Sequence, residues 1–218
     1  MKKILIILIV SVVAIRMLLI PFFGDPLSKM CYYIKGNIYL NNKYDFETQI
    51  DKVEYDFKTS DYFLSANAPV YNSLGFRVYV EGNGFRTEFH DDLNLMKWNF
   101  DIKEKLSPEV LAVYPYADVY VGISRNMVDI YQAETHISEI PNYFDVKELS
   151  KGDIIVSIYL DSYYDSSQLN PAYKVYKTIF ELVEPASIKI KYKNKTFNPP
   201  YNAGLLGNRT EFLQCATD

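Results

Sequence analysis

The sequence predicts an α+β protein behind an N-terminal transmembrane helix. Three observations support this fold class: an almost unbroken apolar run begins the chain, apolar residues then recur at helical spacing, and four short segments next alternate with period two. A smaller set of strands with one helix follows. We therefore expect an anchor (residues 1–24), an α-β4-α module (25–110), a β-x-β-α-β module (111–196) and an irregular tail (197–218).

The apolar run from Ile4 to Phe23 is long enough to cross a membrane. A helix of twenty residues, at about 1.5 Å per residue, just spans a hydrocarbon core of about 30 Å. Arg16 lies two-thirds of the way along, where its side chain can reach the outer interface. Lys2 and Lys3 favour a cytoplasmic N-terminus. We expect a single-pass signal-anchor in the cell membrane, with the C-terminal portion outside.

Two other interpretations of this segment stay open. A cleaved signal peptide would use an apolar region from Ile4 to Ile15, but it needs small residues before the cut. Ala14 is isolated, and Phe22 and Phe23 precede Gly24, so the uncleaved anchor is favoured. A buried helix of a soluble protein is the third interpretation.

Charge and cysteine content limit the function classes. The basic residues at positions 2, 3 and 16 are three of 23, so the rest of the chain carries 20 basic and 27 acidic residues, a net charge of −7. This balance disfavours nucleic-acid binding, which needs clustered Lys and Arg. Four basic residues that alternate near the C-terminus are typical of the solvated face of a strand: Lys189, Lys191, Lys193 and Lys195. One disulfide between Cys31 and Cys215 is permitted outside the cytoplasm, but we expect both to be thiols.

The first module begins with a helix. Asp25 is a suitable N-cap, and Pro26 fits the first helical position. Apolar residues at helical spacing then follow, namely Leu27, Met30, Cys31, Ile34 and Ile38. Asn41 and Asn42 are expected to end this helix.

Four strands are predicted next, from the alternation of apolar and polar residues in 53–57, 62–66, 76–80 and 85–89. They read as an antiparallel meander. Asn83-Gly84 marks a hairpin between the third and fourth strands, because both positions tolerate positive φ. A second helix is expected from Asp92 to Leu106, where Ser107-Pro108 ends it. Its predicted buried residues are Leu93, Met96 and Phe100.

The second module is predicted to contain three strands and one helix. The strands are expected at 117–123, 154–160 and 188–192, and residues 125–150 stay without an assignment. Asn170-Pro171 is a second N-cap with proline, and the helix it begins should end before Pro185. One face of this helix is apolar, with Tyr173, Tyr176, Phe180 and Val183.

Several segments of this chain resemble a known family. They are Gly24-Asp25-Pro26 before a helix, the strand Val53-x-Tyr55-x-Phe57-Lys58 followed by Asp61-Tyr62, and Phe89-His90-Asp91-Asp92 before a helix. Together with the anchor, they resemble the YfjL-like group of small anchored proteins from Bacillus and relatives, over about residues 1–110 and more loosely over 153–192. The resemblance implies a bacterial extracytoplasmic α+β protein of a group without an assigned activity, and it supplies no site residue.

Few residues are candidates for chemistry. His90, Asp91 and Asp92 could form an acid/base pair or bind a metal, but adjacent strand residues point in opposite directions, so an aspartate that caps the next helix is the favoured interpretation. Asp161 and Asp165 could hold Ca²⁺, yet the segment lacks the oxygen count and the turn glycine of a calcium loop. His136 stands alone beside Glu134 and Glu139 and is expected to be structural or at the surface.

These observations favour a non-catalytic protein. We expect no catalytic, cofactor-binding or metal-binding residue, no cofactor and no enzymatic activity. The expected partners are the cell membrane, through residues 4–23, and a peptide, protein or envelope polymer that contacts the exposed sheet and its aromatic residues. The alternative is a cell-envelope hydrolase that uses His90 with Asp91 or Asp92.

Overall fold

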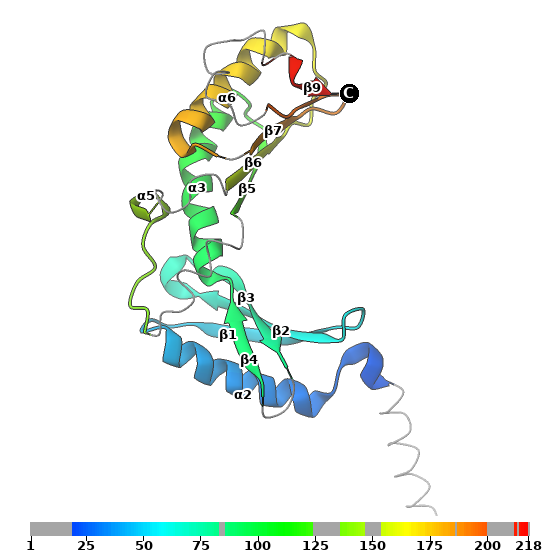
Figure 1. Ribbon diagram of the computed structural model, residues 1–218, viewed down its shortest axis with the longest axis vertical. Helices are drawn as coiled ribbons and strands as arrows, with labels where there is room; N and C mark the ends of the chain where they lie inside the picture. Colours follow the sequence, from blue (N-terminus) through cyan, green and yellow to red (C-terminus); the bar gives the residue numbers. More distant parts are fainter. Residues whose placement is uncertain are drawn as a thin grey trace, which may run out of the picture. The chain divides into compact units, whose positions relative to one another are not determined.

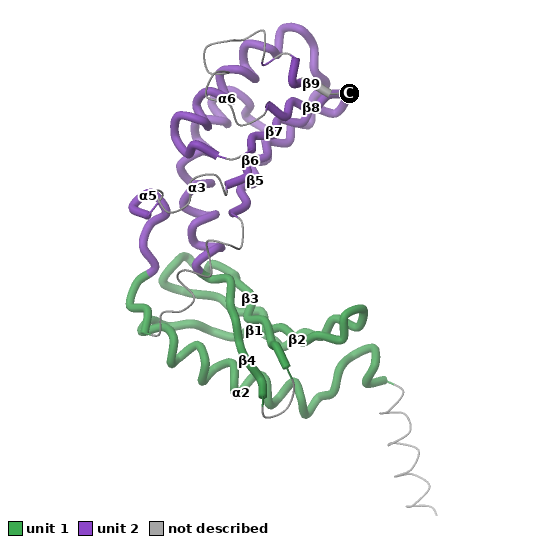
Figure 2. The backbone as a smooth tube through the Cα atoms, viewed as in Figure 1, with its two compact units in different colours: residues 1–93, 134–139 green, residues 94–133, 140–218 purple. Residues whose placement is uncertain are grey.

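The chain forms two compact units, each with its own sheet. In the computed structural model, the described residues are 19–82, 86–123, 136–146, 154–185, 187–199, 212 and 214–217. Unit 1 comprises residues 1–93 and 134–139, and unit 2 comprises residues 94–133 and 140–218 (Figure 2). The predicted α+β class is confirmed, with a four-stranded antiparallel sheet in unit 1 and a five-stranded mixed sheet in unit 2.

The predicted transmembrane segment lies mostly outside the described residues. Its first fifteen positions, 4–18, are not described, whereas residues 19–23 are helical. Within the part of the chain that is described, no helix has both the length and the apolar character needed to cross a membrane.

Unit 1 contains the predicted meander (Figure 1). Its strands are β1 (Gln49–Asp56), β2 (Asp61–Ala68), β3 (Leu74–Glu81) and β4 (Glu88–Asp91), and a 3-10 turn, η1 (Pro69–Tyr71), joins β2 to β3. Each strand pairs antiparallel with the next. The pairing of β3 with β4 is thus confirmed, although the predicted turn residues Asn83 and Gly84 are outside the described residues.

Helix α2 (Pro26–Lys43) covers one face of this sheet. Its predicted start is confirmed, because the Asp25 carboxylate accepts a hydrogen bond of 2.9 Å from the Ser28 N–H. Gly36 brings the helix close to the sheet, since a Cβ atom there would lie 2.4 Å from Leu64 Cδ2. The face of α2 that the sheet buries consists of Tyr32, Gly36, Leu40 and Lys43. It is not the apolar stripe from which the sequence predicted the helix.

Helix α3 (Leu93–Leu111) corrects the second predicted helix. Pro108 does not end it, and Phe100 is exposed rather than buried. Leu93 is fully buried, as predicted, and from Trp98 onward the fully buried residues recur every four positions: Trp98, Ile102, Leu106 and Val110. A proline inside a helix costs about 3 kcal/mol. Burying two aliphatic side chains on either side of it, at about 1.5 to 3 kcal/mol each, offsets that cost.

The sheet of unit 2 has the order β5-β6-β7-β8-β9. The predicted strand–strand–helix–strand module is present as β5 (Asp118–Ile123), β6 (Ile154–Tyr159), α6 (Leu169–Val183) and β7 (Ser187–Lys191). Strands β6 and β7 are parallel, and α6 connects them. A short helix, α5 (Tyr143–Val146), precedes β6.

Two details of this module differ from the prediction. Helix α6 begins at Leu169 rather than after Asn170, because it continues directly from a 3-10 turn, η4 (Ser166–Gln168), that the Asp165 carboxylate caps through the Ser167 N–H. The tail is not wholly irregular, since β8 (Thr196–Phe197) pairs with β9 (Ala216–Thr217). The Phe212 ring also stacks on Phe197 at 5.2 Å. Two-residue strands have too few positions to show a period.

The two cysteines follow the expectation. Cys31 and Cys215 are both thiols, and neither takes part in a disulfide.

Candidate functional site

The end of β4 holds the residues that the sequence marked for chemistry. In β4, His90 lies opposite Tyr79 of β3, and Asp91 lies opposite Val78. Successive side chains of a strand point to opposite faces, so these two residues are separated by the sheet. Asp91 is on the face that α2 covers, where it is 3% exposed. His90 is on the other face, with its side chain 44% exposed.

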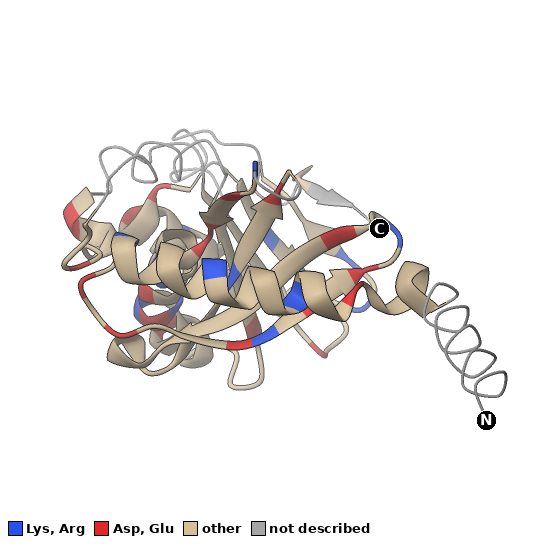
Figure 3. Cartoon of the chain, turned by 90° about the horizontal axis from the view of Figure 1, so that it is seen from below, with Lys and Arg blue, Asp and Glu red and all other residues tan. Residues whose placement is uncertain are grey.

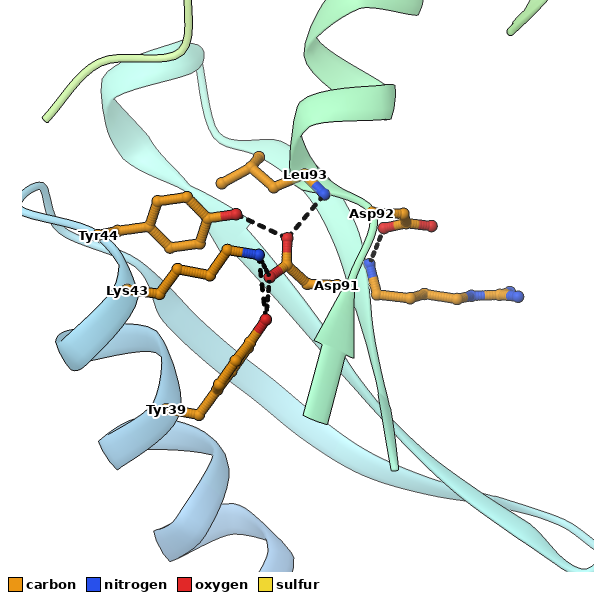
Figure 4. Close-up of polar contacts among 7 residues, drawn as sticks. Tyr39, Lys43, Tyr44, Asp91, Asp92 and Leu93 are labelled. Carbon is orange, nitrogen blue, oxygen red and sulfur yellow. Dashed lines mark hydrogen bonds and ion pairs between the residues drawn. The ribbon is translucent and has the colours of Figure 1, made fainter. Parts of the chain in front are cut away.

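Asp91 is the centre of a buried cluster of four residues with Tyr39, Lys43 and Tyr44, which we call the Asp91 cluster (Figure 4). Its Oδ2 accepts hydrogen bonds of 2.7 Å from the Lys43 ammonium and from the Tyr39 hydroxyl. Its Oδ1 accepts from the Tyr44 hydroxyl at 2.7 Å and from the Leu93 N–H at 3.1 Å. The side chains of Lys43 and Asp91 are 7% and 1% exposed. Tyr39 and Lys43 come from successive turns of α2.

The electrostatics of this cluster fix its protonation states. Burial, and then the negative charge of Asp91, raise the pKa of Tyr39 and of Tyr44 well above the usual range of tyrosine. Both phenols therefore stay neutral and act as donors. Since four donors surround the carboxylate, its acceptor positions are filled by the fold itself. The Asp91 cluster is thus built to join α2, β4 and the start of α3.

Asp92 has a different role from Asp91. Its Oδ1 accepts a hydrogen bond of 2.6 Å from the Arg77 N–H, and its own N–H donates to the Arg77 carbonyl at 3.1 Å. The Tyr79 hydroxyl lies 3.4 Å from its Oδ2. Asp92 therefore extends the pairing with β3, while the carboxylate that contacts the first N–H of α3 belongs to Asp91. Of the two aspartates predicted as possible caps, Asp91 is the one whose carboxylate accepts a hydrogen bond at the start of α3, from the Leu93 N–H.

Asp92 gives the stability a testable dependence on pH. Burial raises its pKa above the usual range, against the lowering effect of the Arg77 N–H bond, and the charge of Asp91 raises it further. A raised pKa in the folded state means that ionising Asp92 destabilises the fold as the pH rises past the unfolded pKa. We expect Asp92→Asn to become more stable relative to the wild type as the pH rises from 4 to 7, with both free energies of unfolding measured in urea at each pH. A difference in free energy between the two proteins that stays constant with pH, or that shifts in favour of the wild type as the pH rises, would contradict this assignment.

The hydrolase hypothesis finds little support in this geometry. His90 and Asp91 lie on opposite faces of the sheet, so they cannot act on one substrate atom. The His90 imidazole instead lies near Glu81, with 3.7 Å between His90 Nε2 and Glu81 Oε2. Asp92 uses its carboxylate to hold the backbone of β3.

The face of the sheet opposite α2 carries a row of side chains that sequence reasoning missed. Glu54 of β1, Phe63 of β2, Tyr79 of β3 and His90 of β4 are successive cross-strand partners, and all four are half-buried. We call them the sheet row. The Arg77 guanidinium lies 5.0 Å from the centre of the Phe63 ring. The alternation within each strand was visible in the sequence, but the register that aligns these four residues was not.

The other candidates are accounted for by local contacts. Asp161 pairs with Lys193 at 2.7 Å. Asp165 caps η4, and the hydrogen bonds that its carboxylate accepts from Ser167 lower the pKa of that carboxyl. His136 is exposed, 4.0 Å from Asp45. Lys189 and Lys191 lie on the exposed face of β7, as predicted. Within the described residues, no group of three or more His, Cys, Asp or Glu side chains is placed to hold a metal ion.

The comparisons with known proteins agree with the resemblance read from the sequence. Residues 1–86 match the family described as YfjL-like, N-terminal domain. This range takes in α2 and β1 to β3, and it ends just before β4. No significant match was found among curated proteins or among solved structures. The N-terminal part of the chain, residues 1–86, is therefore similar to the N-terminal domain of the YfjL-like family.

Proposed function

We propose that the protein is a non-catalytic interaction module. In this proposal, residues 4–23 anchor it in the cell membrane, its C-terminal portion lies outside, and it binds a peptide or protein segment of the envelope through the sheet row. The observation that supports the proposal most is the sheet row itself: two aromatic rings lie between a carboxylate and an imidazole on one face of a four-stranded sheet.

The composition of this face suits a polypeptide partner. Aromatic residues and arginine are enriched where proteins meet, because they bring a large contact area together with polar groups. Phe63 and Tyr79 are neighbours in the sheet row, and Arg77 lies over the Phe63 ring. Charges of both signs, from Glu54 and Arg77, fit the mixed charges of a peptide better than those of an anionic polymer. The net charge of −7 after position 16 would also repel such a polymer.

The sheet also holds the row in a fixed arrangement. All four residues belong to paired strands, and α2 is fastened to the opposite face by the Asp91 cluster. A surface that is ordered before binding loses less conformational entropy when it binds. This is the property expected of a module that recognises a partner without a chemical step.

Photo-crosslinking in the native cells tests this proposal. A photoreactive phenylalanine analogue is placed in the full-length chain at Phe63 and, as a matched control, at Phe57, an exposed phenylalanine outside the sheet row. We expect a discrete adduct from the membrane fraction with a yield several-fold higher at position 63 than at 57. Tyr79→Ser should reduce the yield at position 63. Equal yields at both positions, or yields unaffected by Tyr79→Ser, would overturn the proposal, and an adduct with a polysaccharide would replace its partner class.

A further inference from the structure

Helix α2 has a second apolar face, which is exposed in the part of the chain that the structure describes. Four large apolar residues recur along its turns on the side away from the sheet: Leu27, Met30, Ile34 and Ile38. Their exposed fractions run from 49% to 64%. We call them the α2 stripe. Cys31, also exposed, lies beside Leu27 and Ile34 at helical spacing. A contiguous apolar patch of this kind marks a surface that contacts a partner or a membrane.

The joint before α2 turns the chain where the apolar N-terminal run ends. Residues 19–23 are helical, and the Gly24 N–H closes their last turn on the Ile20 carbonyl at 2.8 Å. Gly24 then adopts a φ of +72°, which ends that helix, and Asp25 caps α2 as a new one. The axis therefore does not continue from the apolar run into α2.

This joint is also fastened to the sheet. The Asp25 N–H donates a hydrogen bond of 2.7 Å to the Tyr62 hydroxyl. A Cβ atom on Gly24 would lie 2.8 Å from the Tyr55 ring. The position at which the chain leaves the apolar run is thus fixed relative to α2 and the sheet.

The charge of α2 fits an anionic surface. From Pro26 to Lys43 there is no acidic residue, although the chain contains 27, and there are three lysines. Figure 3 shows the helix with basic segments and no acidic ones. Lys43 pairs with Asp91, and Lys29 lies on the same side of the helix as Tyr32 and Gly36. Lys35 is beside the α2 stripe, four positions before Tyr39 and three before Ile38. Anionic lipid headgroups attract a lysine in this position, and an apolar stripe next to it is typical of helices that lie in a membrane interface.

We propose that α2 lies flat on the outer surface of the membrane, with the α2 stripe in the lipid interface. This inference rests on the membrane anchor of the proposed function. The apolar run ends at the bilayer surface, and the chain changes direction at Gly24. The α2 stripe is then buried in the interface to a depth of about 5 to 10 Å. Because α2 covers one face of the sheet and the sheet row occupies the other, the sheet row would face away from the membrane.

Cys31 allows a direct test in the full-length chain. Cys215→Ser leaves Cys31 as the only thiol, which is labelled with an environment-sensitive fluorophore after reconstitution into liposomes with anionic lipids. The control carries Cys31→Ser, Cys215→Ser and Val70→Cys, since Val70 of η1 is similarly exposed. Lipids brominated in their acyl chains should quench the probe at position 31 several-fold more than at position 70. Ile34→Asp with Ile38→Asp should abolish this difference while the protein stays in the liposomes. Since both side chains are exposed, circular dichroism should show an intact fold.

The outcomes separate this inference from the proposed function. Protein that fails to float with the liposomes would overturn both. Protein that floats, with a hydrated and unquenched probe at position 31, would overturn the inference alone. A dehydrated probe that lipids do not quench would overturn the inference by showing that protein, and not lipid, covers the α2 stripe. If the dehydration increases with the ratio of protein to lipid, the covering protein is a second copy. If it does not, another segment of this chain covers the stripe.

Discussion

Asp91→Ala is expected to lower the free energy of unfolding by about 3 to 5 kcal/mol, because it removes one partner of a buried ion pair and leaves the other uncompensated. Lys43 is then buried beside two phenols without its carboxylate. The change also removes the acceptor for the Tyr44 hydroxyl and the Leu93 N–H. A helix cap alone would be worth only about 0.5 to 2 kcal/mol. Urea unfolding followed by circular dichroism measures the difference.

The ranking of variants at this cluster identifies the ion pair as the cause. Asp91→Asn should cost nearly as much as Asp91→Ala, because the amide keeps an acceptor but does not balance the Lys43 charge. The double variant Lys43→Met with Asp91→Leu should be less damaging than either change at Asp91, since no buried charge is left. His90→Gln, one residue away on the exposed face, should change stability by less than about 0.5 kcal/mol. A mild effect of Asp91→Asn would show that capping, and not the ion pair, dominates.

Trp98→Ala is expected to lower the free energy of unfolding by about 3 to 5 kcal/mol, the range for truncating a fully buried large aromatic side chain. Trp98 is fully buried, and its indole N–H donates a hydrogen bond of 2.9 Å to the Pro141 carbonyl. The alanine would leave a cavity and remove the donor from that carbonyl. Because Trp98 is the only tryptophan, unfolding is followed by circular dichroism rather than by fluorescence.

Phe100 is the matched control for this variant. It lies two positions further along α3, and it is exposed. Phe100→Ala should cost clearly less than Trp98→Ala, at most about 1 to 2 kcal/mol, because Phe100 is already 36% exposed. Trp98→Phe should fall between the two, since it keeps a buried ring but loses the bond to Pro141. Equal losses from Trp98→Ala and Phe100→Ala would contradict the assignment of the buried face of α3.

The sequence alone determined several local features of this protein. Asp25 and Pro26 fixed the start of α2, because an N-cap and a first-turn proline act within one helical turn. The change to period two predicted β1 to β3 and the antiparallel meander, because alternation is a property of each strand by itself. The same segments supported the resemblance to the YfjL-like group, and the family match over residues 1–86 agrees with it.

The tertiary structure decided which side each element buries. Helix α2 buries the face with Gly36 and exposes the stronger apolar stripe, because only glycine lets the helix approach Leu64 this closely. Helix α3 continues through Pro108, because Leu106 and Val110 are both buried. These outcomes depend on contacts with distant segments, and such contacts leave no periodic signal in the chain.

Only the tertiary structure showed which residues of functional interest lie close together. Lys43 and Asp91 are 48 positions apart in the sequence and 2.7 Å apart in the structure. The sheet row brings together residues of four strands, and a shift of one position in any register would move its member to the other face. The sequence marked His90, Asp91 and Asp92 as one candidate group. The register of β4 against β3 assigned His90 to the exposed face and Asp91 to the core, because adjacent strand residues point in opposite directions.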